Sequence, residues 1–424
     1  MLLRRLRSFL RPRSGRLRVA LFSPSWPPER AHNGVVTYVS ELAPELRRCG
    51  ADVVVLAGHV DEGDRASVAR DGVIDVGATR DTAVEFVRAR VVQRTHGADH
   101  AASRHRAWMV KQSLRLADRS APLDSYEIEE AFGTGRFLRR APGRQVVRLH
   151  GPWQLCAPAL GFDPSAPEHS SRIVDEGRAI AAADAVTSPS QHALDSVRRY
   201  YDLPLREAAV IPNAVALAPA SARWSLERAT PFSVLFVGRF DRLKGADTVL
   251  EAFGRLHAKI PEATLTFVGP DRGMPDGAGG TIHFEDFAAR VLEPAARARV
   301  TYLGPRTRSE IADLRTRAAI TVVASRFETF GMTVVEAMAA ASPVIAARAG
   351  ALPEVLRWAD ADALFEAGSA PALADALHRW LTDRERLASH ADRGRAACAA
   401  DYSPRTVAQR TLELHRRVTG RRAT

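Results

Sequence analysis

The sequence of this 424-residue chain contains only three cysteines, Cys49, Cys156 and Cys398, which are far apart and odd in number. Such spacing argues against a disulfide framework or a cysteine-based zinc site and is typical of proteins from a reducing compartment. The chain also lacks an uninterrupted apolar run of about 18 residues, the length that a membrane-spanning helix requires. With 46% apolar and 26% charged residues, the composition is that of a globular protein with room for two domains.

Acidic residues are outnumbered by basic ones, 49 against 60, which gives a formal net charge of +11. A basic excess is typical of proteins that bind nucleic acid, an anionic membrane surface or anionic substrates. The sequence has neither zinc-finger spacing nor the alternation of aromatic and basic residues that RNA-binding sheets use. We therefore expect a phosphorylated substrate or an anionic lipid surface as the partner, and no nucleic acid.

Residues 1–16 form a basic leader with six arginines. Its apolar residues, at positions 2, 3, 6, 9 and 10, would share one face of a helix, which is the pattern of a helix lying on an anionic bilayer. Pro12 would end such a helix, and the apolar segments are too short for a secretory signal. A disordered basic tail explains the same residues equally well, so both interpretations stay open.

The first half of the chain alternates strand and helix patterns. Residues 17–23 are expected to form a buried strand, 35–49 a helix and 52–56 the next strand, which together are the unit of a parallel, doubly wound sheet. Residues 83–118 are rich in arginine and mostly helical in pattern. Further strands are expected at 126–130, 146–149, 185–187 and 210–211.

The second half repeats this alternation after a stretch rich in Ala, Pro and Ser, residues 214–231, which we interpret as a linker. Strands are expected at 233–237, 264–268, 300–303, 320–323, 344–346 and 363–365. Two alternating halves predict two Rossmann-like α/β domains facing a cleft, with ligands at the carboxyl ends of the strands. The expected organisation is a leader (1–16), a first domain (17–213), the linker, a second domain (232–400) and a basic C-terminal helix within 401–424.

The most informative stretch runs from Ser325 to Met338, where an apolar strand gives way to a helix expected to reach about Ala341. Thr333 and Glu336 have the spacing of a capping box, and Glu328 precedes the helix. Amides at a helix N-terminus bind anions, and carboxylates accept hydrogen bonds from hydroxyl groups. The stretch therefore suits a sugar nucleotide, which has both phosphates and hydroxyls. Taken alone, it is equally compatible with a capping glutamate and an exposed loop acid.

A second motif is the loop from Gly238 to Gly245, which follows a strand and precedes a helix. It lacks the G-x-G-x-x-G spacing of nicotinamide-binding proteins. Arg239 and Lys244 lie five positions apart in this loop, so both side chains can reach one diphosphate. By themselves they would more often be two solvated surface cations.

Together these motifs resemble a known family. The run E-T-F-G-M-T-V-V-E-A-M-A from Glu328, followed by P-V-I-A from Pro343 and G-A-L-P-E from Gly350, resembles the retaining glycosyltransferases of family 4. Their hallmark is two glutamates separated by seven residues, as here. The resemblance implies the GT-B fold, two Rossmann-like domains facing across a cleft, with the C-terminal helix crossing back to the first domain. It covers residues 232–354 densely and the first half only at isolated motifs.

The resemblance assigns roles to individual residues. Arg239 and Lys244 would bind the donor diphosphate and offset charge on the leaving group, and Glu328 would hold hydroxyls of the donor sugar. Glu336 would hold the ribose hydroxyls. Backbone groups near the sugar and phosphates complete the donor site, which comprises Gly34, Gly238, Thr329, Phe330, Gly331, Met332 and Glu336.

On the first domain, the resemblance implies that His150, in the run R-L-H-G-P, lies near the anomeric carbon and stabilises developing positive charge through its ring or backbone carbonyl. Gly34 resembles the second glycine of the family's Gly-Gly loop, whereas Asn33 replaces the first; Asn tolerates positive φ. Ala341 and Ala351 replace glycines that are common in the family, and neither change removes a functional side chain.

No metal or other cofactor is expected, because the arginine and lysine supply the positive charge that a metal ion would otherwise provide. Asp360-Ala361-Asp362 spells the D-x-D pattern of metal-dependent glycosyltransferases of another fold, but it lies away from the phosphate loop.

We therefore expect a retaining, hexosyltransferase-type glycosyltransferase that uses a UDP- or GDP-sugar. Its acceptor would be a lipid-linked or cell-surface polysaccharide precursor, and its location cytoplasmic, including the inner face of the membrane through residues 1–16 and the C-terminal helix. The alternatives are a sugar-nucleotide epimerase or hydrolase of the same fold, and a non-catalytic nucleotide-binding partner of another transferase.

Overall fold

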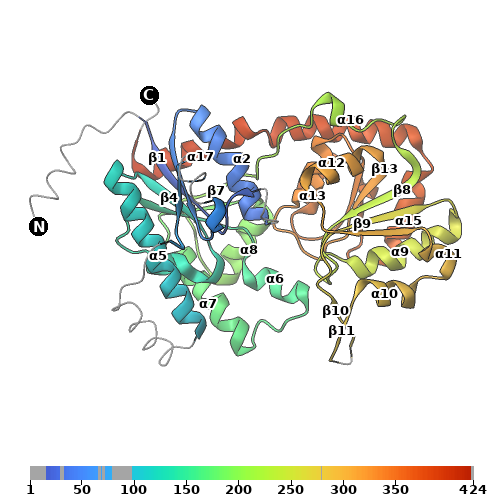
Figure 1. Cartoon of the computed structure of the whole chain (residues 1–424), viewed down its shortest axis with the longest axis horizontal. Coiled ribbons are helices and arrows are strands. Elements are labelled where there is room, and N and C mark those ends of the chain that lie inside the picture. Colours follow the sequence, from blue (N-terminus) through green and yellow to red (C-terminus); the bar gives the residue numbers. More distant parts are fainter. Residues whose placement is uncertain are drawn as a thin grey trace, which may run out of the picture.

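The computed structural model describes residues 16–28, 33–64, 68, 72–78, 98–277 and 279–421. Nearly all of the basic leader and the first part of the arginine-rich segment therefore lie outside the described residues. The described chain forms two α/β domains, each built around a parallel sheet, and Figure 1 shows them side by side. This arrangement confirms the predicted fold class.

The first domain contains a seven-stranded sheet in the order β3-β2-β1-β4-β5-β6-β7, and every neighbouring pair is parallel. Its strands are β1 Arg18–Ser23, β2 Asp52–Ala57, β3 Val73–Asp75, β4 Ser125–Glu129, β5 Arg144–Arg148, β6 Ala185–Ser188 and β7 Ala208–Val210. Its helices are α2 Gly34–Arg48, α5 Ala98–Ser120, α6 Trp153–Leu160, α7 Pro167–Ala181 and α8 Gln191–Tyr201, with a 3-10 segment, η3, at Ala131–Phe137. The central strands are apolar on both faces because helices cover both sides.

The second domain contains a six-stranded parallel sheet in the order β12-β9-β8-β13-β14-β15. Its strands are β8 Thr230–Val237, β9 Thr264–Val268, β12 Val300–Gly304, β13 Ala318–Val323, β14 Val344–Ala347 and β15 Leu364–Phe365. Its helices are α9 Ala246–Lys259, α10 Phe284–Val291, α11 Pro294–Arg297, α12 Arg308–Arg317, α13 Met332–Ala339, α14 Leu352–Val355, α15 Ala370–Leu381 and α16 Arg384–Asp401. A short antiparallel pair, β10 Met274–Pro275 and β11 Thr281–Ile282, projects from it.

The segment between β7 and β8 is ordered by contacts with the second domain. Trp224 is buried, and its indole N–H donates to the carbonyl of Ala318 at 2.7 Å. The amide of Ala218 donates to the carbonyl of Ala339 at 3.1 Å. The connection is therefore packed, although its sequence has no periodic pattern.

The last helix, α17 (Pro404–Thr419), leaves the second domain and packs on the first. Figure 1 shows α16 and α17 running in succession along one side of the molecule, and α17 lies beside α2. Its apolar residues Val407, Leu412 and Leu414 join the core of the first domain, and the ring of His415 hydrogen-bonds to Ser125 at 2.7 Å. The amphipathic pattern of this helix thus serves packing on the first domain.

Candidate active site

The two domains meet where the carboxyl ends of β5 and β13 approach each other. The hydroxyl of Thr329, after β13, donates to the backbone carbonyl of His150, after β5, at 2.6 Å. The hydroxyl of Ser190 donates to the carbonyl of Thr329 at 2.7 Å. Two residues that were predicted from separate motifs are therefore in direct contact. Nothing in the sequence pattern identified Ser190, which also caps helix α8.

The loop after β8 holds its two cations in defined positions. Asp241 is buried, and its carboxylate accepts the guanidinium Nε of Arg239 at 2.6 Å and the amide of Lys244 at 2.8 Å. Gly245 closes the loop with φ +68° and lies so close to Ala324 that a Cβ would collide with its carbonyl oxygen. The loop is therefore fixed at both ends, and the Arg239 side chain stays 41% exposed and able to bind a ligand.

The ammonium group of Lys244 contacts Glu328 directly. Its Nζ lies 2.5 Å from Oε1 of Glu328, which also accepts the hydroxyl of Ser325 at 2.7 Å. The G-A-L-P-E run supports the Glu328 backbone, because Gly350 (φ +53°) packs against it and Ala351 donates to its carbonyl at 2.9 Å. The residues assigned to diphosphate and sugar thus form one ion pair, with a cation and a carboxylate available to a phosphorylated, hydroxylated ligand.

The predicted capping box at Thr333 and Glu336 is wrong. Helix α13 begins two residues earlier than such a box would place it, after Gly331 in a left-handed conformation (φ +100°), and no side chain caps it. The carboxylate of Glu336 instead pairs with Arg315 of α12 at 2.5 Å, because a guanidinium is a stronger partner than a backbone amide. The helix also ends at Ala339 rather than near Ala341.

A pocket of about 230 Å³ lies beside Glu336, between the two domains. Thr37 and Glu41 of α2 form one wall, and Arg315, Met332 and Glu336 belong to the other. Arg308 of α12 spans the walls, donating to Thr37 at 2.5 Å and to Glu41 at 3.2 Å. A carboxylate beside a pocket of this size can accept hydrogen bonds from the hydroxyls of a ligand.

The imidazole of His150 packs edge-on against Tyr38, with the ring centroids 5.2 Å apart. Burial and the nearby Arg148 guanidinium hold the pKa of His150 well below its usual value, so the ring is neutral at pH 7. Arg148 itself is fully buried over the Tyr38 ring and donates to Asn213 at 2.6 Å. The ring of His150 thus packs on Tyr38, which is itself held by buried polar residues of the first domain.

Gly34 is the first residue of α2, and Asn33 is its N-cap, with the side chain accepting the amide of Val35 at 2.8 Å. The φ of Asn33 is −137°, so the positive φ expected at this position is not used. Asparagine is a strong N-cap residue, which explains why it fits where the family has glycine. A Cβ on Gly34 would meet nothing within 4 Å, so this helix end is open to a ligand.

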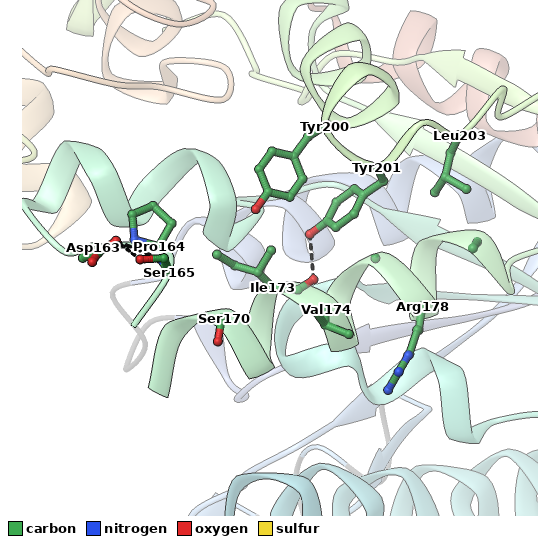
Figure 2. A pocket seen from close by; sticks show the side chains of 12 residues that line it. Asp163, Pro164, Ser165, Ser170, Ile173, Val174, Arg178, Tyr200, Tyr201 and Leu203 are labelled. Atoms are coloured by element: carbon green, nitrogen blue, oxygen red, sulfur yellow. Dashed lines mark hydrogen bonds between the residues drawn. The ribbon is translucent and has the colours of Figure 1, made fainter. Parts of the chain in front are cut away.

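A larger hollow of about 580 Å³ lies elsewhere on the first domain, between α7 and the end of α8 (Figure 2). Figure 2 shows Tyr200 and Tyr201 above Ile173 and Val174 of α7. The Tyr201 hydroxyl already donates to the carbonyl of Ile173 at 2.8 Å. None of the predicted site residues lines this hollow, so its size alone does not make it the active site.

The D-x-D residues do not form a ligand cluster. Asp360 pairs with Arg393 at 3.1 Å, and Asp362 pairs with Arg386 at 2.5 Å. Among the described residues, no group of three or more His, Cys, Asp or Glu side chains is placed to hold a metal ion. The helices in the described part of the chain include none with the length and apolarity needed to cross a bilayer.

Comparison with known proteins gives two family matches that divide the chain between them. Residues 32–218 match the model described as Glycosyltransferase Family 4, and residues 221–397 match Glycosyl transferases group 1. A D-inositol 3-phosphate glycosyltransferase from Streptomyces avermitilis is 26% identical, over 90% of this chain and 82% of the relative.

Solved structures with the same fold cover both domains. Sucrose-phosphate synthase from Thermosynechococcus elongatus aligns with a TM-score of 0.72 and 22% identity, over 96% of this chain and 100% of that structure. HepE of Anabaena, in complex with UDP and glucose, aligns with a TM-score of 0.65 and 18% identity, over 94% of this chain and 98% of that structure. At these identities the likeness shows the fold alone.

Proposed function

The chain belongs to glycosyltransferase family 4, and we propose that it is a retaining enzyme that moves a sugar from a UDP- or GDP-sugar to an acceptor hydroxyl. The observation that carries this proposal is the junction of the two domains. There the Lys244–Glu328 ion pair lies one residue from the Thr329–His150 hydrogen bond. The backbone of His150 therefore lies beside the loop that carries Glu328, which supports the roles proposed for Lys244, Glu328 and His150.

In the proposed reaction, the bond between the anomeric carbon and the diphosphate oxygen breaks, and a bond to the acceptor oxygen forms on the same face. The departing phosphate oxygen takes the acceptor proton, so the products are a glycoside and a nucleoside diphosphate. Arg239 and Lys244 would stabilise the charge on the leaving group. Glu328 and Glu336 would position the sugar and ribose hydroxyls, and His150 would face the anomeric carbon.

The donor proposed first is a UDP-sugar, because HepE is seen with UDP and glucose and shares this fold. Relatives named D-inositol 3-phosphate glycosyltransferases favour a small phosphorylated acceptor, which also fits a chain with net charge +11. The lipid-linked or polysaccharide precursor expected from the basic leader remains the second acceptor proposal. An acceptor screen should therefore contain both classes.

The test is nucleotide release from a panel of UDP-, GDP- and ADP-sugars, with and without acceptors. Acceptor-dependent release from one donor that is lost in Glu328→Ala and Arg239→Ala would support the proposal. Arg242→Ala is the matched control, because Arg242 lies in the same loop but its side chain is near Gly161. Turnover without any acceptor would instead favour a hydrolase or epimerase, and binding without turnover a non-catalytic partner.

We also propose that the protein is cytoplasmic and binds the inner face of the membrane through its basic leader. Arg16, the first described residue, lies beside the end of α17, where Arg421 donates to its carbonyl at 2.9 Å. Co-sedimentation with anionic liposomes, with and without residues 1–16, tests this. Equal and negligible binding of both forms would remove the proposal.

A further inference from the structure

The turn from His150 to Trp153 is held by two buried carboxylates from outside it. Glu130 accepts the amide of His150 on one oxygen, at 2.9 Å, and the amide of Gly151 on the other, at 2.7 Å. Glu176 of α7 accepts the amide of Trp153 at 2.6 Å. Pro152 has no N–H, so every backbone donor of the turn is bound to one of these two glutamates.

Both carboxylates are almost completely removed from solvent, with Glu130 1% and Glu176 0% exposed. Glu176 has a cationic partner, since the Nε of Arg172 lies 2.8 Å from its carboxylate. Among the described residues, no cation forms an ion pair with Glu130, whose carboxylate is balanced by the two amides. Burying a carboxylate in this way is costly, but each of its two oxygens can accept one amide, which a glutamine side chain, with one oxygen and one NH2 group, cannot do.

What Glu130 holds is the backbone that faces the second domain. The carbonyl of His150 accepts the Thr329 hydroxyl at 2.6 Å, and the ring of His150 packs on Tyr38. A carboxylate that fixes the two amides flanking this carbonyl also fixes its direction. It therefore sets where the imidazole lies relative to Glu328, the residue that precedes Thr329.

We propose that Glu130 is a positioning residue for glycosyl transfer, which clamps the His150–Gly151 backbone so that His150 faces the donor sugar. This inference rests on the role proposed for His150. Glu130 does not touch the donor in this view and acts only through the turn that it holds. Its loss should therefore lower kcat and leave nucleotide affinity unchanged, because the phosphate loop and Glu336 belong to the other domain.

The protonation of Glu130 gives this clamp a pH dependence. Burial and the neighbouring Glu176 raise the pKa of Glu130 to about 8, while the amides of His150 and Gly151 act in the opposite direction. Cys156 of α6 and Tyr201 of α8 also face it, and Arg172 balances Glu176.

The ionised form has lone pairs for both amides, whereas the protonated form carries a hydrogen on one oxygen. As pH rises through about 8, Glu130 loses its proton and can then accept both amides, so the turn is held more firmly. Turnover of the wild type should rise over the same range.

The experiment compares Glu130→Gln with Asp124→Asn. These two residues flank β4 at opposite ends, and Asp124 is also a buried carboxylate that accepts a backbone amide, that of Arg18, at 2.9 Å. For the donor sugar that the wild type uses, kcat is measured from pH 6 to 9. The dissociation constant of the corresponding nucleoside diphosphate is measured for each variant. Glu130→Gln should lower kcat by about 10- to 100-fold at pH 9 and much less at pH 6, lose the rise near pH 8 and keep the dissociation constant within about twofold. Asp124→Asn should change none of these.

Three outcomes would decide against the inference in distinguishable ways. If His150→Ala abolishes turnover, but kcat of Glu130→Gln stays within about threefold of the wild-type value and still rises near pH 8, the positioning role of Glu130 is wrong. If Glu130→Asp, whose shorter side chain keeps the charge but loses the reach to both amides, has wild-type kcat, the clamp geometry is irrelevant. The Glu130→Asp variant also provides the test if Glu130→Gln does not fold. If His150→Ala itself retains kcat, the role proposed for His150 fails, and this inference fails with it.

Discussion

The hydroxyl of Thr329 donates a 2.6 Å hydrogen bond to the backbone carbonyl of His150, and the two residues come from different domains. The carbonyl of Thr329 accepts a second bond from the first domain, from Ser190 at 2.7 Å. The residue that follows Glu328 is therefore fixed to the first domain on both its side chain and its backbone. The position of Glu328 is thus coupled to the contact between the two domains.

Replacing Thr329 by Val should weaken catalysis by loosening this junction. Valine keeps the shape of threonine but loses the donor, and a neutral hydrogen bond contributes about 0.5–1.5 kcal/mol. We expect kcat/KM for the donor to fall by roughly 3- to 10-fold. Thr301→Val, the same change at an exposed position on β12, is the control. Equal values for the two variants would show that the hydrogen bond does not matter to turnover.

The loop after β8, residues 238–245, should be intolerant of a side chain at Gly245. Both Gly245 (φ +68°) and Gly420 (φ +69°) have left-handed backbones, but only at Gly245 would a Cβ collide, with the Ala324 carbonyl. Alanine at Gly420 should cost about 1 kcal/mol of unfolding free energy, from backbone strain alone. Alanine at Gly245 should cost at least about 2 kcal/mol more, because β13 must shift. Urea unfolding of both variants measures the difference, and equal losses would contradict the close approach.

Much of this architecture was predictable because it depends on local patterns. Apolar strands alternating with amphipathic helices gave the two parallel sheets, and the strand-G-R-x-x-x-x-K-G and E-x7-E spacings located the loops after β8 and β13. The turn holding His150 was also recognisable in sequence. In each case, the residues that determine the local fold are adjacent in the chain.

The features that sequence reasoning missed depend on partners far away in the chain. The spacing of Thr333 and Glu336 is that of a capping box, yet Arg315, which comes from another helix, pairs with the glutamate. In the sequence, Glu130 is only the last residue of an expected strand. Its contacts with His150 and Gly151 form because β4 pairs with β5 in the folded protein. The strand β3 has three residues, too few to show a period.

Because Lys244 and Glu328 form an ion pair, replacing one or the other should have opposite effects on nucleotide affinity. Their nitrogen and oxygen lie 2.5 Å apart, with side chains 25% and 15% exposed. Lys244→Met should weaken binding of the nucleoside diphosphate by about 10-fold, because a cation near the phosphates is lost. Glu328→Gln should strengthen it by roughly 2- to 5-fold, because Lys244 is released from its carboxylate, while sugar turnover is lost.

Isothermal titration with UDP and GDP measures both constants, and Arg242→Met serves as the control for a charge lost from the same loop. Weaker nucleotide binding in Glu328→Gln would show that the carboxylate does not compete with the diphosphate for Lys244.

Acid should loosen the contact between α17 and the first domain through His415. The ring is fully buried, and burial lowers its pKa to about 4, below the value of about 6.5 in an unfolded chain. As pH falls below 6.5, the unfolded state takes up the proton first, so the neutral folded form loses stability. Relative to His415→Gln, the wild type should lose about 2 kcal/mol between pH 7 and pH 5. Unfolding curves at the two pH values measure this, and a constant difference would contradict it.

A second junction between the domains is made by Glu354, the last residue of the G-A-L-P-E run. Its two carboxylate oxygens accept the amides of Gln191 and His192, at 3.0 and 3.1 Å, at the N-terminus of helix α8. A negative charge at this end of a helix is stabilised by the unpaired amides and the helix dipole, by about 0.3–2 kcal/mol. Because the bonds cross between domains, that energy is available only when the cleft is closed.

Glu354→Gln should therefore shift the free protein toward open forms without altering the chemistry. We expect the donor KM to rise by roughly 2- to 10-fold with kcat nearly unchanged, since saturating donor restores closure at the expense of binding energy. The radius of gyration in solution scattering should rise without ligand and return toward the wild-type value with nucleotide. Glu366→Gln, a change at an exposed glutamate of the same domain, is the control. A fall in kcat with unchanged KM and scattering would mean that Glu354 acts on the reaction itself and not on closure.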